Sequence, residues 1–124
     1  QGYQGATGAS GSPWGGGTFT AGITVQGTVT AYTFNATSDI NAKTNITDIT
    51  NATNIINQIN GVEFNWKSDG KKSSGVIAQE LEKILPHLVD DINGAKSVNY
   101  NGLIGYLIES NKELQKRIEV LESK

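Results

Sequence analysis

The C-terminal part of the sequence has a heptad-type spacing of apolar residues, the feature that most constrains the fold. Apolar side chains recur at alternating steps of four and three positions, with a single polar member. The seam consists of Tyr100, Ile104, Leu107, Asn111, Leu114, Ile118 and Leu121. Because so narrow a stripe is buried by a second helix, residues 101–124 are predicted to form a coiled coil. The alternative is an amphipathic helix that packs on its own domain.

Charged residues cover most of the remaining helix surface, which favours the coiled coil. They are Glu109, Lys112, Glu113, Lys116, Arg117, Glu119 and Glu122. A lone asparagine in such a seam fixes the register and the number of helices at some cost in stability. We therefore expect the chain to associate with copies of itself through the seam.

The N-terminal end has a different composition, because most of the 15 glycines lie before residue 30. Glycine occupies positions 2, 5, 8 and 11, which is the three-residue period of a collagen-type triple helix. Residues 1–14 are interpreted as the end of a collagen-like Gly-x-y repeat, or else as part of a Gly-rich linker. Together with the C-terminal seam, the first interpretation indicates three chains.

Residues 15–37 are predicted to form a β-stranded fibre end. Between Thr18 and Phe34, β-branched or aromatic residues alternate with small ones, and Gly22 and Gly27 interrupt the pattern. This pattern is typical of short strands joined by tight turns. A single copy would bury too little apolar surface to offset its ordering entropy, so we expect it to pair with other copies. A ligand-binding β-surface is the less favoured alternative.

The segment from 44 to 100 is predicted to be a compact α+β unit. Isoleucines within residues 44–60 recur at roughly helical spacing. Residues 62–66 predict a strand and residues 68–70 a turn, and residues 76–78 predict a short strand that leads into a helix ended by Pro86. Asn93-Gly94 predicts a second hairpin. The expected fold class is therefore α+β, with short β-hairpins and a long C-terminal helix that forms a trimeric coiled coil, preceded by a β-rich fibre segment.

Composition excludes several classes of function. The chain has no cysteine, and its formal net charge of −2 provides no basic field for nucleic acid. We expect no membrane partner, because there is no apolar run of 18 residues. His87 next to Asp90 and Asp91 is interpreted as a surface residue rather than a metal ligand, and no metal or cofactor is predicted. The lack of Met at position 1 suggests a piece of a longer polypeptide, by appearance its C-terminal part.

The stretch TSDINAK, residues 37–43, places a hydroxyl and an amine near each other among few apolar residues. A serine hydroxyl becomes a nucleophile when a base removes its proton, and a lysine can be that base where burial favours the neutral amine. Ser38 and Lys43 are five positions apart, so a turn could bring them together, whereas a helix would place them on different faces. The alternative is an ordinary helix N-cap followed by a solvated lysine.

Several motifs follow one another in an order that resembles a known family. They are Ser38-Asp39 with Lys43, FNWK (64–67), GVIAQE (75–80), Leu85-Pro86, Leu88-Val89 and SVNY (97–100). Across residues 38–121, the sequence resembles the S74-type autoprocessing peptidases. These are intramolecular chaperone domains at the C-terminus of phage tail spikes and tail fibres, such as endosialidases, and they also occur in a self-cleaving membrane-bound transcription factor.

The resemblance implies a homotrimeric domain that assembles the upstream fibre of the same chain and then cuts itself off. By position, it implies a self-cleaving serine endopeptidase in which Ser38 is the nucleophile, Lys43 is the general base and the bond between Thr37 and Ser38 is cleaved. Asp39 and Gln79 match positions that would support the geometry of the loop.

The resemblance also implies an organisation of the chain, with residues 38–100 as the chaperone and autoprocessing domain and residues 101–124 as the trimeric coiled coil. It implies a virion tail fibre or spike precursor that folds in the host cytoplasm. Relatives often have an arginine in the Ser-Asp-x-x-x-Lys stretch, but this sequence has Asn41, so any contact of that arginine is absent.

Two alternatives involve no cleavage. One is a structural trimerisation tip that stays attached to the fibre. The other is a receptor-binding tip that uses exposed aromatic residues such as Tyr3, Trp14 or Tyr32.

Overall fold

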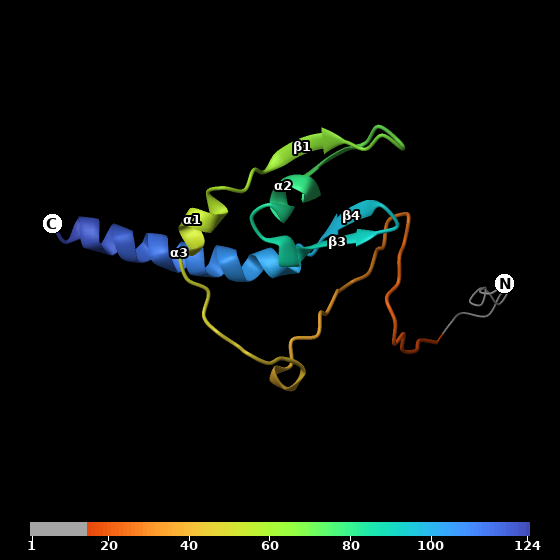
Figure 1. Cartoon of the computed structure of the whole chain (residues 1–124), viewed down its shortest axis with the longest axis horizontal. Coiled ribbons are helices and arrows are strands. Elements are labelled where there is room, and N and C mark those ends of the chain that lie inside the picture. The colour runs from red at the N-terminus through yellow and green to blue at the C-terminus, as the bar shows by residue number, and fades with distance from the viewer. Residues whose placement is uncertain (1–14) are drawn as a thin grey trace. The chain divides into compact units, whose positions relative to one another are not determined.

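A computed structural model describes residues 15–124, and the chain divides into two units (Figure 1). Unit 1 spans residues 1–42 and unit 2 spans residues 43–124. The Gly-x-y repeat predicted for residues 1–14 lies outside the described residues.

The described part of unit 1, residues 15–42, is irregular and exposed along its whole length, apart from one short 3₁₀ helix, η2 (Ile40–Ala42). No strand forms between Thr18 and Phe34 in the single chain. Apolar side chains there remain in solvent, and Phe19 and Ile23 are both 62% exposed. The segment buries too little of this apolar surface to be stable by itself, so its pairing with other copies stays a prediction.

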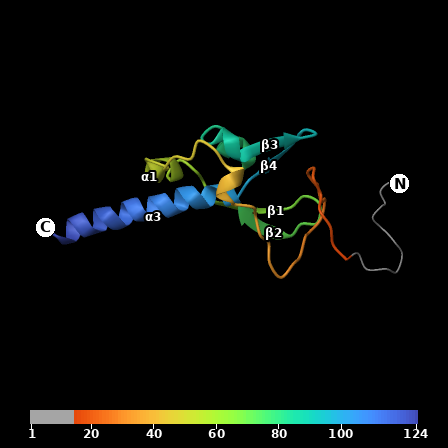
Figure 2. The same ribbon diagram turned by 90° about the horizontal axis from the view of Figure 1, so that it is seen from below.

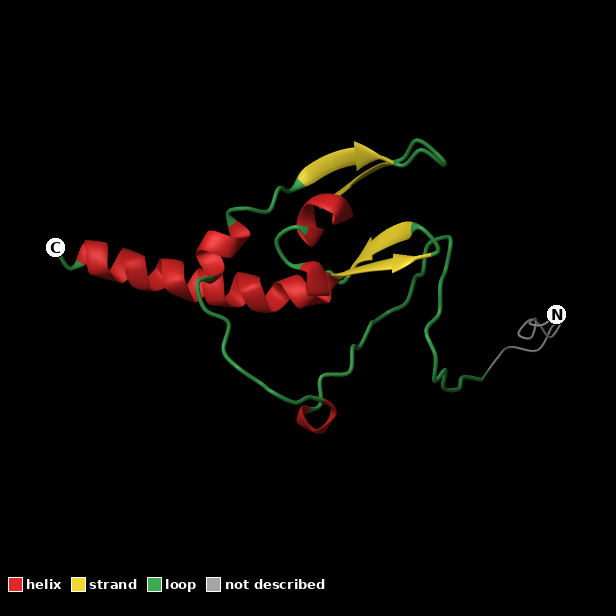
Figure 3. Ribbon diagram, in the orientation of Figure 1, coloured by secondary structure: helices red, strands yellow, loops and turns green. Residues whose placement is uncertain are grey.

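Unit 2 is a small α+β fold with two antiparallel hairpins and a long C-terminal helix, which confirms this part of the expected fold class (Figure 3). Its elements are α1 (Ala52–Ile56), β1 (Val62–Asn65), β2 (Lys72–Gly75), α2 (Ala78–Glu82), η3 (Pro86–Leu88), β3 (Val89–Ile92), β4 (Ala95–Val98) and α3 (Asn101–Glu122). Strand β1 pairs with β2, and β3 pairs with β4, so each sheet has two strands.

Asn93 and Gly94 form the turn between β3 and β4, as predicted. Their φ angles are 53° and 82°, in the left-handed region that a two-residue hairpin turn requires at both central positions. The Asp91 carboxylate accepts a hydrogen bond of 2.9 Å from the backbone N–H of Gly94. This turn sets the register in which Val89 lies opposite Val98.

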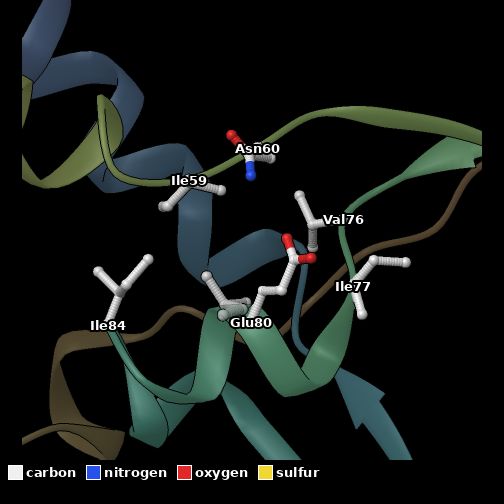
Figure 4. A pocket seen from close by; sticks show the side chains of 7 residues that line it. Ile59, Asn60, Val76, Ile77, Glu80 and Ile84 are labelled. Carbon is white, nitrogen blue, oxygen red and sulfur yellow. The ribbon is translucent and has the colours of Figure 1, made fainter.

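The core of unit 2 is a small cluster of leucines between α2, η3 and α3. Leu81, Leu85 and Leu88 are 1%, 5% and 4% exposed. Ile59, Val76 and Ile84 surround the cluster on one side and leave no space for a water molecule (Figure 4). On the other side, a Cβ at Gly102 would overlap Leu88 Cδ2, so glycine permits the close approach of α3.

Three sequence predictions for unit 2 were wrong in extent, and one of them is the helix expected to end at Pro86, since α2 already ends at Glu82. The helix expected within residues 44–60 is limited to the five residues of α1. Asn45 and Asn51 have φ angles of 53° and 59°, which a helix cannot include, and Asn and Thr side chains compete for backbone hydrogen bonds. The strand expected at residues 76–78 lies earlier, at β2, and Ala78 already begins α2.

Helix α1 begins at a cap supplied by α3. The N-cap residue Asn51 makes no side-chain capping hydrogen bond. Instead, the Glu113 carboxylate accepts hydrogen bonds of 2.9 Å from the backbone N–H groups of both Ala52 and Thr53. The Thr53 hydroxyl lies 2.9 Å from the hydroxyl of Ser110, which is only 6% exposed. Because a five-residue helix has little stability of its own, α1 depends on this contact with α3.

Helix α3 has two distinct apolar faces. One face packs on its own unit through Leu103 and Tyr106, which lie against the leucine core. The other face is the predicted seam, whose apolar residues range from 43% exposed at Leu114 to 66% at Leu121. The C-terminal part of α3 extends beyond the other elements of unit 2 in both views (Figures 1 and 2). Helix α3 therefore packs on its own unit, as the alternative interpretation expected, and the coiled coil through the exposed seam stays a prediction.

We predict that Leu81→Ala lowers the free energy of unfolding by about 2–5 kcal/mol, because it leaves a cavity in a closely packed cluster. Ile46→Ala, at a side chain that is 62% exposed, is the matched control and should change stability by less than about 0.5 kcal/mol. Urea denaturation at a fixed protein concentration measures both values. Equal losses in the two variants would contradict the position of the core.

The Glu113 cap should make stability depend on pH. Hydrogen bonds donated by Thr53, foremost by its backbone N–H, and by Ala52 hold the pKa of Glu113 below its usual value. A lowered pKa in the folded state stabilises the fold above the unfolded value of about 4.3. This contribution is lost as the pH falls through the lower folded value.

We therefore expect the wild type to lose more stability than Glu113→Gln between about pH 6 and about pH 3, measured by urea denaturation at each pH. Glu119→Gln, at an exposed glutamate on the same helix, should follow the wild type. Parallel curves for Glu113→Gln and wild type would show that the cap contributes nothing.

Candidate functional site

The predicted catalytic serine and lysine lie on either side of the short 3₁₀ helix η2. Thr37, Ser38 and Asp39 precede η2, and Lys43 follows it. All four residues are exposed in the single chain. Ser38 falls in unit 1, and Lys43 is the first residue of unit 2.

Asp39 shapes the backbone that follows Ser38. Its carboxylate accepts a hydrogen bond of 2.8 Å from the backbone N–H of Asn41, and its carbonyl accepts one of 3.0 Å from Ala42 N–H. An aspartate that binds the backbone two residues on forms a local turn without help from distant residues. Only the backbone of residue 41 is used, so this turn does not depend on the side chain of Asn41.

Gln79, the other predicted supporting residue, lies on α2 at an open groove of about 570 Å³ in unit 2. The groove is lined by Phe64, Trp66, Val76, Ile77, Ala78, Gln79, Lys96, Ser97, Val98 and Tyr100. Phe64 and Trp66 meet edge to face, with ring centroids 5.0 Å apart. The groove brings together residues from FNWK, GVIAQE and SVNY, three of the motifs on which the resemblance was based.

Tyr100 joins two of these motifs directly. Its hydroxyl oxygen accepts a hydrogen bond of 3.2 Å from the backbone N–H of Val76. A Cβ at Gly75 would overlap that hydroxyl, so glycine is required for this approach. Tyr100, counted in the seam from its spacing, therefore also has a role within its own unit, and it is 50% exposed.

Lys96 provides a charged wall of the groove, which the sequence analysis missed. Its amine lies 3.2 Å from a Glu82 oxygen and 3.5 Å from Asp91, which is its cross-strand partner. The hydrogen bond with Glu82 is the main cause that raises the pKa of Lys96, and Asp91 adds to it. The Asn93-Gly94 turn could have revealed the pair with Asp91, because it fixes which residues of the hairpin face each other.

The described residues contain neither a cluster of metal ligands nor a helix that could span a membrane. Within residues 15–124, no three His, Asp or Glu side chains converge as a metal site would require. His87 is exposed, and its Nε2 lies 3.4 Å from the Tyr106 hydroxyl. None of the helices in residues 15–124 has the length and apolar content needed to cross a bilayer.

Residues 38–90 match the model of the Peptidase S74 family, described as chaperone of endosialidase. No curated protein shows significant similarity to the chain. The match confirms the resemblance that the motifs indicated and suggests an intramolecular chaperone role, in a family associated with autoproteolytic domains. It begins at Ser38 and extends into β3, so SVNY and α3 lie beyond it.

Proposed function

We propose that this chain is the C-terminal intramolecular chaperone of a phage tail fibre or tail spike. It drives homotrimerisation and folding of the upstream fibre in the host cytoplasm and then releases itself by serine autoproteolysis between Thr37 and Ser38. The observation that supports this most directly is the family match, because it begins at the residue that would become the new N-terminus.

The exposed seam of α3 supports assembly with other copies. Six of its residues, from Ile104 to Leu121, lie in solvent in the single chain. Burying such a stripe against neighbouring helices removes apolar surface from water. By their alternating spacing, Ile104 and Ile118 occupy a positions and Leu107 and Leu114 occupy d positions, a combination also suited to two strands. The proposal of three chains therefore rests on the family resemblance and the Gly-x-y period.

The proposed cleavage occurs within one chain. The Lys43 amine accepts the proton of the Ser38 hydroxyl as Oγ attacks the Thr37 carbonyl carbon. The tetrahedral intermediate collapses to an ester between Thr37 and Ser38 Oγ, and the proton passes to the freed α-amino group. Water then hydrolyses the ester, which leaves a carboxylate on Thr37. No substrate pocket is needed, because the nucleophile and the scissile bond are neighbours in the chain.

Assembly would control this reaction through the environment of the lysine. An amine accepts a proton near neutral pH only where burial favours its neutral form, and Lys43 is exposed in the single chain. Neighbouring chains would supply the missing burial, so cleavage would follow assembly. The coiled coil brings three chains together and raises their effective concentration for one another. The strands of the β-fibre, whose pairing is otherwise slow because it is non-local, can then pair faster. Removal of the clamp would then leave the fibre kinetically trapped.

We predict that the purified chain yields a fragment that begins at Ser38, and that Ser38→Ala abolishes it because the nucleophile is lost. Lys43→Ala should slow cleavage by at least about a hundredfold, since general-base catalysis contributes about 10²–10⁴-fold. Mass spectrometry and a denaturing gel measure the fragment. Lys71→Ala, at an exposed lysine beyond the proposed dyad, is the control and should cleave at the normal rate.

Full-length material in every sample would favour the alternative of a structural trimerisation tip that stays attached to the fibre. The exposed seam is compatible with this alternative, because assembly through the seam requires no cleavage. A cleaved Ser38→Ala variant would instead show that another group, or a contaminating protease, breaks the bond.

Introducing charge into the seam should separate the chains. We expect Leu107→Lys, Leu114→Lys and Ile118→Lys together to convert a trimer into single chains, measured by analytical ultracentrifugation. Val120→Lys, at an apolar residue that is 51% exposed but outside the seam, should remain trimeric. The triple variant should also cleave more slowly, and normal cleavage by single chains would disprove the coupling to assembly.

A further inference from the structure

Helix α3 holds the segment that follows Lys43 along a strip formed by Gly105, Ser110 and Glu113. At one end, an ideal Cβ on Gly105 would lie 3.1 Å from Ile49 Cδ1, so Ile49 packs directly over this glycine. At the other end, Glu113 and Ser110 bind the start of α1 through the contacts described above. Residues 49–53 are therefore attached to α3 at two places.

The attachment is tight and depends on a charge. Ala52 is 0% exposed, so its N–H cannot turn to water if the carboxylate is removed. A buried donor that loses its partner is costly, and hydrogen bonds to an ionised acceptor are stronger than neutral ones. The low pKa of Glu113 agrees with a carboxylate that is ionised in the folded state.

The strip connects the lysine to the seam. Lys43 lies six residues before Ile49, so this attachment restricts the positions that its backbone can reach. On the same helix, Gly105, Ser110 and Glu113 alternate in sequence with the seam residues Leu107, Asn111 and Leu114. Because α3 is rigid, contacts with other chains that hold the seam in place would also hold the strip in place.

We propose that Glu113 is a positioning residue for autoprocessing, because it anchors the lysine-bearing segment to the helix that assembles the chains. This inference rests on the function proposed above. Glu113 touches no reacting atom in the scheme and acts only through residues 49–53. It thereby gives assembly at the seam a physical route to the geometry of Lys43.

The test is the cleavage rate of Glu113→Gln in the full chain. The amide of glutamine has about the same size, but it offers only one acceptor oxygen to two N–H donors. We expect cleavage to slow about tenfold, since small misplacements of reacting groups cost large factors in rate. Glu113→Asp, which keeps the charge, should recover part of the rate, and Glu119→Gln is the matched control.

Three further measurements separate positioning from general destabilisation. Sedimentation and circular dichroism should show that Glu113→Gln has the same assembly state and helix content as the wild type. Hydrogen exchange should accelerate at the amides of Ala52 and Thr53 in Glu113→Gln. If this variant fails to fold, Thr53→Val replaces it, because it removes a hydroxyl that contacts Ser110 and helps to lower the pKa of Glu113, and it should slow cleavage with the assembly intact.

Normal cleavage by either folded variant, with accelerated exchange at these amides, would overturn the role of Glu113 and leave the proposed function in place. A slow rate that accompanies loss of assembly in both variants would also overturn it, because the effect would then be structural. Absence of cleavage in the wild type would overturn the proposed function itself, and the positioning role with it.

Discussion

The contact between Glu113 and the start of α1 is the interaction on which the arrangement of unit 2 depends. Helix α1 has five residues, too few to persist without tertiary contacts. Its own N-cap residue provides no side-chain hydrogen bond, and the carboxylate from α3 satisfies two N–H groups that would otherwise be free. The positive end of the helix dipole further favours the carboxylate there. The chain between unit 1 and the first hairpin is thus held by the long helix.

The same helix has two apolar faces, one packed on its own unit and one exposed, and this separation explains its composition. Gly102 and Gly105 lower the intrinsic helix propensity of α3, but they permit close approach of Leu88 and Ile49. The seam has no such glycine and presents branched or long apolar side chains. A helix that only packed on its own unit would have little reason to keep Leu114 and Ile118 in solvent, at 43% and 48% exposure. The proposed self-association would provide that reason.

Features determined by neighbouring residues could be predicted from the sequence. The Asn93-Gly94 hairpin and the long helix were both found, because turn chemistry and heptad spacing act locally. The extent of α1 could not be found, because isoleucine spacing suggested a helix where Asn45 and Asn51 adopt left-handed backbone. The Glu113 cap joins positions about sixty residues apart, so no local sequence pattern predicts it.

The candidate site shows the same division. The turn after Ser38 is local, since the Asp39 carboxylate accepts a hydrogen bond from the backbone N–H of Asn41, whereas a role of Asp39 in cleavage stays a prediction. The groove was not expected, because its walls come from both hairpins and α2. Its residues nevertheless include those that suggested the family, and Tyr100 and Gly75 meet there at a distance that no side chain at residue 75 would allow. Packing between these motifs therefore provides a structural reason for their occurrence together.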